Sequence, residues 1–143
     1  MPFTFKMQKV LDYRTQLEEE AKVRYADAQA RLHKCRQSLD ALVSEIHAAQ
    51  AKGAELMQAA ERWLHDQYLK GLQADYAALA LQERMLAQVA EEARAHLAAC
   101  AIDRKMLDKL KERQQAQYAR AEQKQELKFN DEIATIRHKA PAL

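Results

Sequence analysis

The chain has 143 residues and a formal net charge of +2, from 23 basic and 21 acidic side chains, so the whole chain has no strong electrostatic attraction to nucleic acid or to a membrane surface. It contains only two glycines and two prolines, where average usage gives roughly ten and seven. Both prolines lie near the ends, at Pro2 and Pro141, so long helices are sterically allowed between them. Ala, Glu, Lys, Leu and Arg form more than half of the sequence and favour helix.

Several classes of protein are disfavoured by missing sequence features. No apolar run reaches the roughly 18 residues of a membrane span, and the N-terminus lacks the apolar stretch of a secretory signal, so we expect a cytoplasmic protein. No phosphate-binding loop, HExxH or GxSxG motif is present, and the five histidines are scattered. We therefore expect no enzymatic activity, no catalytic residues, no metal site and no cofactor. Cys35 and Cys100 are expected to be reduced, buried thiols.

The first predicted helix, about residues 5–50, carries a coiled-coil seam. Its apolar positions alternate in steps of four and three residues, which is the heptad spacing of helices that pack on one another. This seam comprises Ala28, Leu32, Cys35, Leu39, Leu42, Ile46 and Ala49.

A chain reversal is predicted at about residues 51–55. Gly53 follows the first seam, and glycine is the usual residue just beyond a helix C-terminus, whereas Gly71 lies between good helix formers. Gly53 is the favoured position and Gly71 stays as the alternative. A reversal at Gly53 places Cys35 opposite the region of Gly71.

The second predicted helix, about residues 56–138, carries its own seam, interrupted by Glu83 and Arg104. The seam comprises Leu72, Tyr76, Leu79, Leu86, Ala90, Ala93, Leu97, Cys100 and Leu107. Two seams predict an all-α fold in which two long helices form an antiparallel coiled-coil hairpin, a single domain over residues 1–143. Because the second helix is longer, it overhangs the first at the C-terminus.

Two surfaces stand out as candidates for partner contact. The overhang from Arg104 to Lys139 has ten basic and six acidic residues, although a solvated helix end explains part of this excess. After the reversal, Trp63, Tyr68, Leu69, Leu72 and Tyr76 form the densest apolar cluster. One seam cannot bury all five, so structural packing is the first interpretation of this cluster and an exposed patch for a partner is the second.

The two ends of the chain resemble those of the flagellar type III export protein family FliJ. The opening residues Phe3, Phe5, Met7, Val10, Leu11 and Arg14 follow the family's F-x-F-x-L-x-x-V-L-x-x-R pattern, with Met7 in place of Leu. The closing residues are similar to E-Q-K-x-x-D-E-x-A, with Leu127 in place of Gln; they are Glu126, Lys128, Asp131, Glu132 and Ala134. Arg62 and Trp63, followed by Tyr68, Leu69 and Leu72, resemble the stretch after the family's hairpin.

The resemblance implies a stalk-like component of the flagellar export apparatus, cytoplasmic and peripherally associated with the inner-membrane machinery. Its implied partners are the hexameric export ATPase, whose ring assembly it would promote, the cytoplasmic domain of the membrane export gate, and export chaperones. It implies neither nucleic-acid binding nor stable membrane insertion. By position, ATPase contact falls on Arg104, Lys105, Lys109, Lys111, Arg113, Glu126, Lys128, Asp131 and Glu132, and gate contact on Leu42, Tyr68, Leu72 and Tyr76.

Three other functions remain open at this point. The equivalent stalk of a virulence type III secretion system would have a similar sequence. A general coiled-coil scaffold would dimerise through its seam, whereas a self-contained hairpin would be monomeric. A basic-helix nucleic-acid binder would show affinity that falls steeply with salt, but the acids that interrupt its basic run place this interpretation last.

Overall fold

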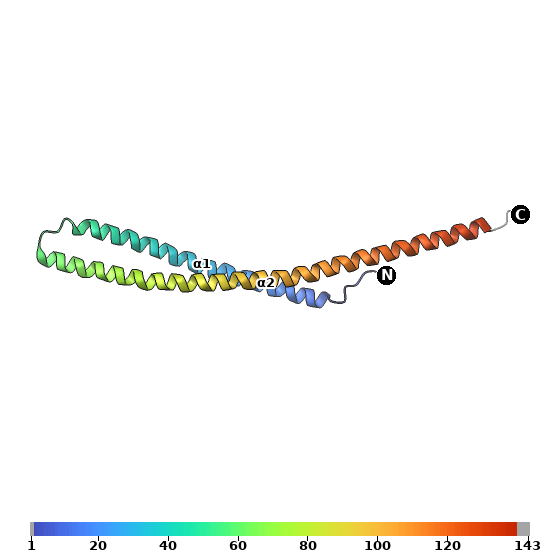
Figure 1. Ribbon diagram of the computed structural model, residues 1–143, viewed down its shortest axis with the longest axis horizontal. Coiled ribbons are helices and arrows are strands. Elements are labelled where there is room, and N and C mark those ends of the chain that lie inside the picture. The colour runs from blue at the N-terminus through green and yellow to red at the C-terminus, as the bar shows by residue number, and fades with distance from the viewer. Residues whose placement is uncertain (1, 140–143) are drawn as a thin grey trace. The chain divides into compact units, whose positions relative to one another are not determined.

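The computed structural model describes residues 2–139 and contains two helices, α1 (Gln8–Gly53) and α2 (Ala59–Lys139) (Figure 1). No strand occurs among these residues, and the helices contact each other as a hairpin in which α2 is the longer, with 81 residues against 46. The predicted fold class is confirmed. The helix limits differ from the predicted 5–50 and 56–138 by one to three residues, and the reversal occupies residues 54–58. Gly71 lies inside α2.

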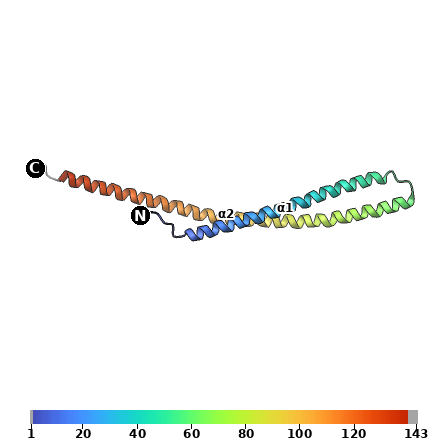
Figure 2. The same ribbon diagram turned by 180° about the vertical axis from the view of Figure 1, so that it is seen from behind.

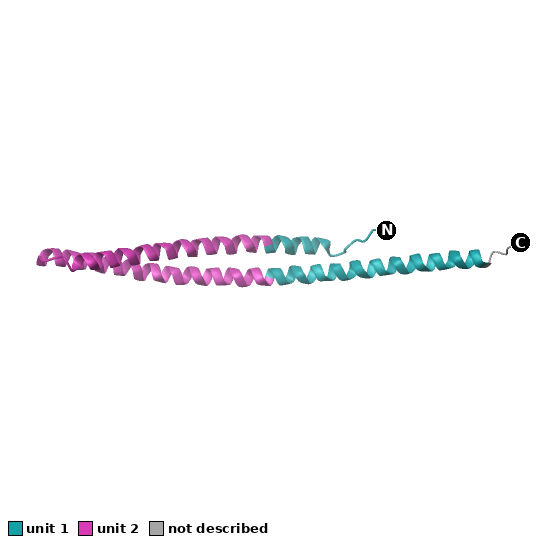
Figure 3. Ribbon diagram, turned by 90° about the horizontal axis from the view of Figure 1, so that it is seen from above, with its two compact units in different colours: residues 1–18, 100–143 teal, residues 19–99 magenta. Residues whose placement is uncertain are grey.

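Backbone contacts divide the chain into two compact units, Met1–Glu18 with Cys100–Leu143, and Glu19–Ala99 (Figure 3). We call them the terminal unit and the hairpin unit. The single domain expected over residues 1–143 stays a prediction.

In the hairpin unit, α1 and α2 run side by side, as both opposite views show (Figures 1 and 2). The Tyr68 hydroxyl donates to Glu45 Oε1 at 2.9 Å, and the Cys35 thiol contacts the Leu79 carbonyl oxygen at 3.8 Å. The expectation that Cys35 faces the region of Gly71 is therefore wrong. The chain reverses over 54–58 and not at Gly53, and each residue of displacement in a hairpin moves the facing position by two.

The inner seam of the hairpin unit matches the predicted pattern. All seven positions predicted on α1, from Ala28 to Ala49, are buried or half-buried, and so are those predicted on α2 from Leu72 to Leu97, except Tyr76. Tyr76 is 40% exposed. Glu83, which interrupts the heptad, forms an ion pair with Arg36 at 3.1 Å. A polar seam residue is thus satisfied by a partner on the other helix.

The terminal unit packs the N-terminal segment against α2. Phe5 and Leu11 are buried, and the rings of Phe3 and Tyr118 lie 5.7 Å apart at 51°. Arg14 forms a salt bridge with Asp103 at 3.3 Å. Beyond these contacts, α2 continues past the N-terminal segment (Figure 3). Every residue from 119 to 132 is exposed. The predicted C-terminal overhang is confirmed.

Gly53 has a different role from the one expected. No described glycine has a positive φ, so Gly53 does not end α1 in the left-handed conformation. A Cβ atom at Gly53 would lie 2.7 Å from His65 Nε2 and 2.8 Å from His65 Cδ2. The glycine therefore allows the imidazole of α2 to pack against the last turn of α1. Across the reversal, Arg62 Nε donates to the Leu56 carbonyl oxygen at 2.8 Å.

Alanine substitutions at the two glycines should have different effects. Gly71→Ala should raise the free energy of unfolding by about 1 kcal/mol, because alanine favours helix and its Cβ meets nothing within 4 Å. Gly53→Ala should give no such gain, because the His65 ring must move away. Thermal unfolding followed by circular dichroism measures both.

A double-mutant cycle isolates the Gly53–His65 contact. With His65→Ala already present, Gly53→Ala should become more favourable than it is in the parent chain. Additive effects of the two substitutions would show that the contact does not influence stability.

Candidate partner-binding surfaces

The C-terminal part of α2 presents charged and apolar side chains together. Four of the residues assigned to ATPase contact from the family motif are exposed: Glu126, Lys128, Asp131 and Glu132. Between and beside them, Leu127, Phe129 and Ile136 are 62–68% exposed. Exposed apolar side chains among charges are typical of a surface that another protein covers.

The basic residues nearer the N-terminal segment are less uniform. Lys105, Lys109 and Arg113 are exposed and Lys111 is half-buried. Arg104 is half-buried because its guanidinium forms ion pairs with Glu18 of α1 and Asp108 of α2. The hydrogen bonds that Arg104 donates to Glu18 and, second, to Asp108 raise the pKa of Arg104. Arg104 is thus held by ion pairs within the chain, whereas Lys105, Lys109 and Arg113 lie at the surface.

Glu18 was not identified as a structural residue from the sequence. Glu18 is only 6% exposed, and it is the one buried charged residue in the part of the chain that the structure describes. A signal was present, because Arg104 interrupts an apolar seam and a buried cation requires an acidic partner. The partner lies 86 residues away, so only the register of the two helices identifies it.

Removing one side of this ion pair should destabilise the protein more than removing both. Glu18→Leu leaves Arg104 with Asp108 alone in a half-buried position, so we expect the melting temperature to fall by several degrees, measured by circular dichroism. Glu18→Leu combined with Arg104→Leu should recover most of the loss, because leucines suit a coiled-coil seam. A double variant as unstable as the single one would contradict this account.

The residues assigned to gate contact separate into two groups. Tyr68 and Tyr76 are 49% and 40% exposed, whereas Leu72 is 7% exposed and Leu42 is half-buried. The hydrogen bond to Glu45 raises the pKa of Tyr68 above its ordinary value. Leu72 is buried and lies about one helical turn from each of the two tyrosines. Of the aromatic cluster, Trp63 is also exposed, at 61%, while Leu69 is half-buried.

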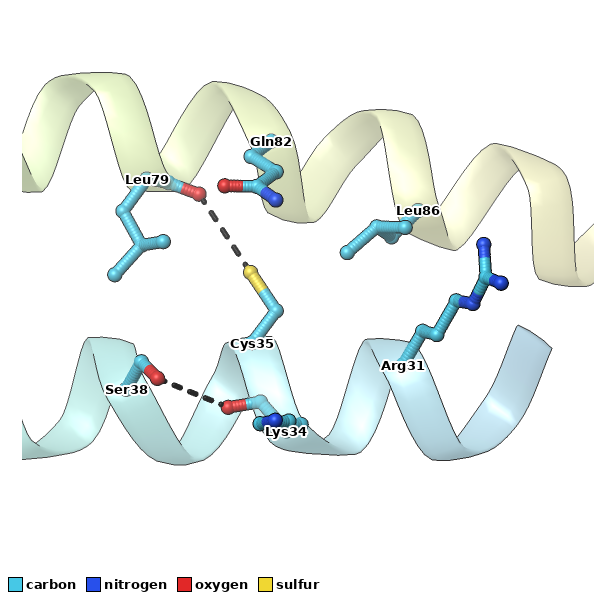
Figure 4. A pocket seen from close by; sticks show the side chains of 7 residues that line it. All are labelled: Arg31, Lys34, Cys35, Ser38, Leu79, Gln82 and Leu86. Carbon is cyan, nitrogen blue, oxygen red and sulfur yellow. Dashed lines mark hydrogen bonds between the residues drawn. The ribbon is translucent and has the colours of Figure 1, made fainter. Parts of the chain in front are cut away.

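A groove of about 410 Å³ lies between the helices around Cys35 (Figure 4). Leu79 and Leu86 of α2 and the stems of Arg31 and Lys34 of α1 line it. Cys35 and Cys100 are both buried thiols, as expected. It is an open surface groove between the two helices of the coiled coil.

Within residues 2–139, neither helix contains a stretch long and apolar enough to cross a membrane. The same residues contain no group of three or more His, Cys, Asp or Glu side chains placed to hold a metal ion.

The fold and these surfaces define a coiled-coil hairpin protein whose second helix carries an exposed C-terminal extension. The family model described as "Flagellar FliJ protein" matches residues 3–142, nearly the whole chain, and its first matched residue is Phe3 of the opening motif. The chain therefore belongs to the FliJ family, a family of non-catalytic components of flagellar type III export. The comparisons with curated proteins and with solved structures give no match.

Proposed function

We propose that the chain binds the hexameric ATPase of the flagellar export apparatus through the C-terminal part of α2 and promotes assembly of the ATPase ring. It also couples the ring to the export gate and to export chaperones, in the cytoplasm and peripherally at the inner membrane. Membership of the FliJ family supports a place in flagellar export. The assignment of particular residues to the ATPase and to the gate is supported by the exposure of their side chains.

The observation that carries the ATPase assignment is the exposure of α2 beyond Tyr118. A helix with every residue from 119 to 132 exposed buries no apolar stripe of its own against α1. An isolated helix gains little stability in water, so a partner that covers Leu127 and Phe129 would stabilise it. The mixed charges of Glu126, Lys128 and Asp131 suit the polar wall of a pore.

The basic positions from Arg104 to Arg113 have two roles in this proposal. Lys105, Lys109 and Arg113 are exposed and contact the ATPase directly. Arg104 acts within the chain, since its ion pair with Glu18 holds the N-terminal segment against α2. Lys111, which is half-buried, lies between these two groups.

Gate contact is assigned to the side of the hairpin unit that displays Tyr68 and Tyr76. Both rings are partly exposed and can anchor a partner, as tyrosines do at many interfaces. Leu72 and Leu42 support this surface from within the seam.

ATP hydrolysis by the co-encoded export ATPase, titrated with this protein, tests the first assignment. The full chain should stimulate hydrolysis, and a chain that ends at Arg120 should not. This truncation keeps Tyr118 beneath Phe3 and thus preserves the packing of the terminal unit, whereas a truncation before Arg104 would remove it.

A charge reversal within the extension provides the matched control. Lys128 lies in the family motif, so Lys128→Glu should weaken stimulation several-fold. Lys124 is also exposed but lies outside the motif, so Lys124→Glu should stimulate like the parent chain. Full stimulation by the Arg120 truncation would exclude the extension as the ATPase-binding segment.

The gate assignment is tested by binding to the cytoplasmic domain of the gate protein. Tyr68→Ala and Tyr76→Ala should each weaken binding about tenfold, as expected for a partly buried anchor residue. Tyr13→Ala is the control, because Tyr13 is 57% exposed and lies in the terminal unit. Isothermal titration calorimetry measures all three, and equal affinities would reject this surface.

The competing functions give different results in the same experiments. A general scaffold would dimerise, and its mass in solution would be twice that of the chain, with no effect on ATP hydrolysis. Membership of a flagellar family favours the flagellar apparatus over a virulence secretion system.

A further inference from the structure

A second stripe with heptad spacing runs along α2 in the hairpin unit, on the side away from the inner seam. Its positions alternate in steps of three and four residues, and all are exposed, whereas the inner seam is buried or half-buried except at Tyr76. Its apolar and small members are Leu64, Gly71, Ala74, Ala78, Leu81 and Met85, with Gln67 as the one polar position. We call this stripe the outer seam.

The outer seam is small at its centre and large at its ends. Gly71, Ala74 and Ala78 form the centre, while Leu64 and Met85 near the ends are each 63% exposed. Small residues on a helix surface allow a second helix backbone to approach closely, and the large residues then pack against its sides. This size profile is complementary to a helix with large side chains at its centre.

Gly71 gives an independent reason to expect such a helix. Glycine inside a helix is unfavourable relative to alanine. A Cβ at Gly71 would meet nothing within 4 Å, so the packing of the described chain does not require a glycine there. A closely packed partner helix on the outer seam would require one.

The edges of the outer seam indicate the charge of the partner. Lys70 and Arg84 lie in equivalent heptad positions along one edge, and both are exposed. Among the residues that the structure describes, neither forms a salt bridge within the chain. Asp75 lies on the opposite edge. An acidic partner edge would complement Lys70 and Arg84.

A second copy of the chain is a poor occupant of this surface. Antiparallel pairing centred between Ala74 and Ala78 brings Lys70 of one copy against Arg84 of the other. Parallel pairing in register places Gly71 on Gly71 and Met85 on Met85, so a centre that needs a short interhelical distance lies between ends that need a long one. Both arrangements carry a repulsion or a void.

We propose that the outer seam binds an amphipathic α-helix of another protein, whose central apolar side chains are large and whose edge facing Lys70 and Arg84 is acidic. The outer seam lies in the hairpin unit and excludes Tyr68, Tyr76 and the C-terminal part of α2. The proposal therefore does not depend on the contacts assigned to the ATPase and the gate.

A designed peptide tests the proposal on the full-length protein. The probe is a fluorescein-labelled helical peptide of about three heptads, with leucine at its core positions and glutamate along one edge. Fluorescence anisotropy should show saturable binding. A second peptide with lysine in place of these glutamates should bind about tenfold more weakly, because it meets Lys70 and Arg84 with like charge.

Variants of the protein identify the surface that binds. Gly71→Leu and Ala78→Glu should abolish peptide binding, because each fills the space that the central leucines of the peptide need, while circular dichroism shows an intact hairpin. Ala30→Glu is the matched control, an exposed alanine on α1, and should bind like the parent. Equal binding to the Gly71→Leu variant, no binding at all, or indifference to peptide charge would overturn the proposal. Self-association that Gly71→Leu abolishes would assign the outer seam to a second copy.

Discussion

A hairpin of two helices can bury only one stripe of each helix, and this constraint determines most of the properties of the protein. In a globular domain, further layers cover the remaining faces. Here the inner seam of the hairpin unit is narrow, and small residues such as Ala28, Cys35, Ala49 and Ala90 are among its most buried members. Large apolar residues outside the seam, including Met57, Trp63 and Met85, stay 61–89% exposed. In such a fold, a large apolar residue that lies outside the seam is therefore exposed.

Within such a seam, charged residues select one register. Apolar heptads permit slippage by whole heptads, because each layer resembles the next. Glu83 with Arg36 in the hairpin unit, and Glu18 with Arg104 in the terminal unit, pair across the two helices in the observed alignment. A shift by one heptad would separate both pairs and would place the half-buried Arg104 opposite Leu11 or Tyr25, which is unfavourable for an ion. The sequence features that look like defects of the seams thus specify how the helices align.

Most of the fold could be predicted from the sequence because it depends on local features. The scarcity of glycine and proline, the heptad steps and the position of Gly53 are sufficient for two helices, their seams and the approximate reversal. The pairs of residues that face each other could not be predicted as well. A displacement of the turn by three residues changes the residue that faces any given position by about six. For this reason the sequence alone places Cys35 at the wrong level of α2 and does not identify the ion pair between Glu18 and Arg104. Among the candidate contact residues, the sequence did not separate Leu72, which the seam buries, from Tyr68 and Tyr76, which it leaves exposed.

The outer seam of α2 illustrates a general consequence of the two-helix constraint. A heptad stripe on an exposed face lowers solubility, and a glycine within it weakens the helix, so both are unfavourable for an isolated hairpin. The inner seam does not need either feature, since Gly71 and Met85 contribute nothing to it. The same helix that pairs with α1 through Leu72, Leu79 and Leu86 therefore has a second side organised for helix packing. On this basis the hairpin is two-thirds of a three-helix assembly, and its third helix comes from another protein.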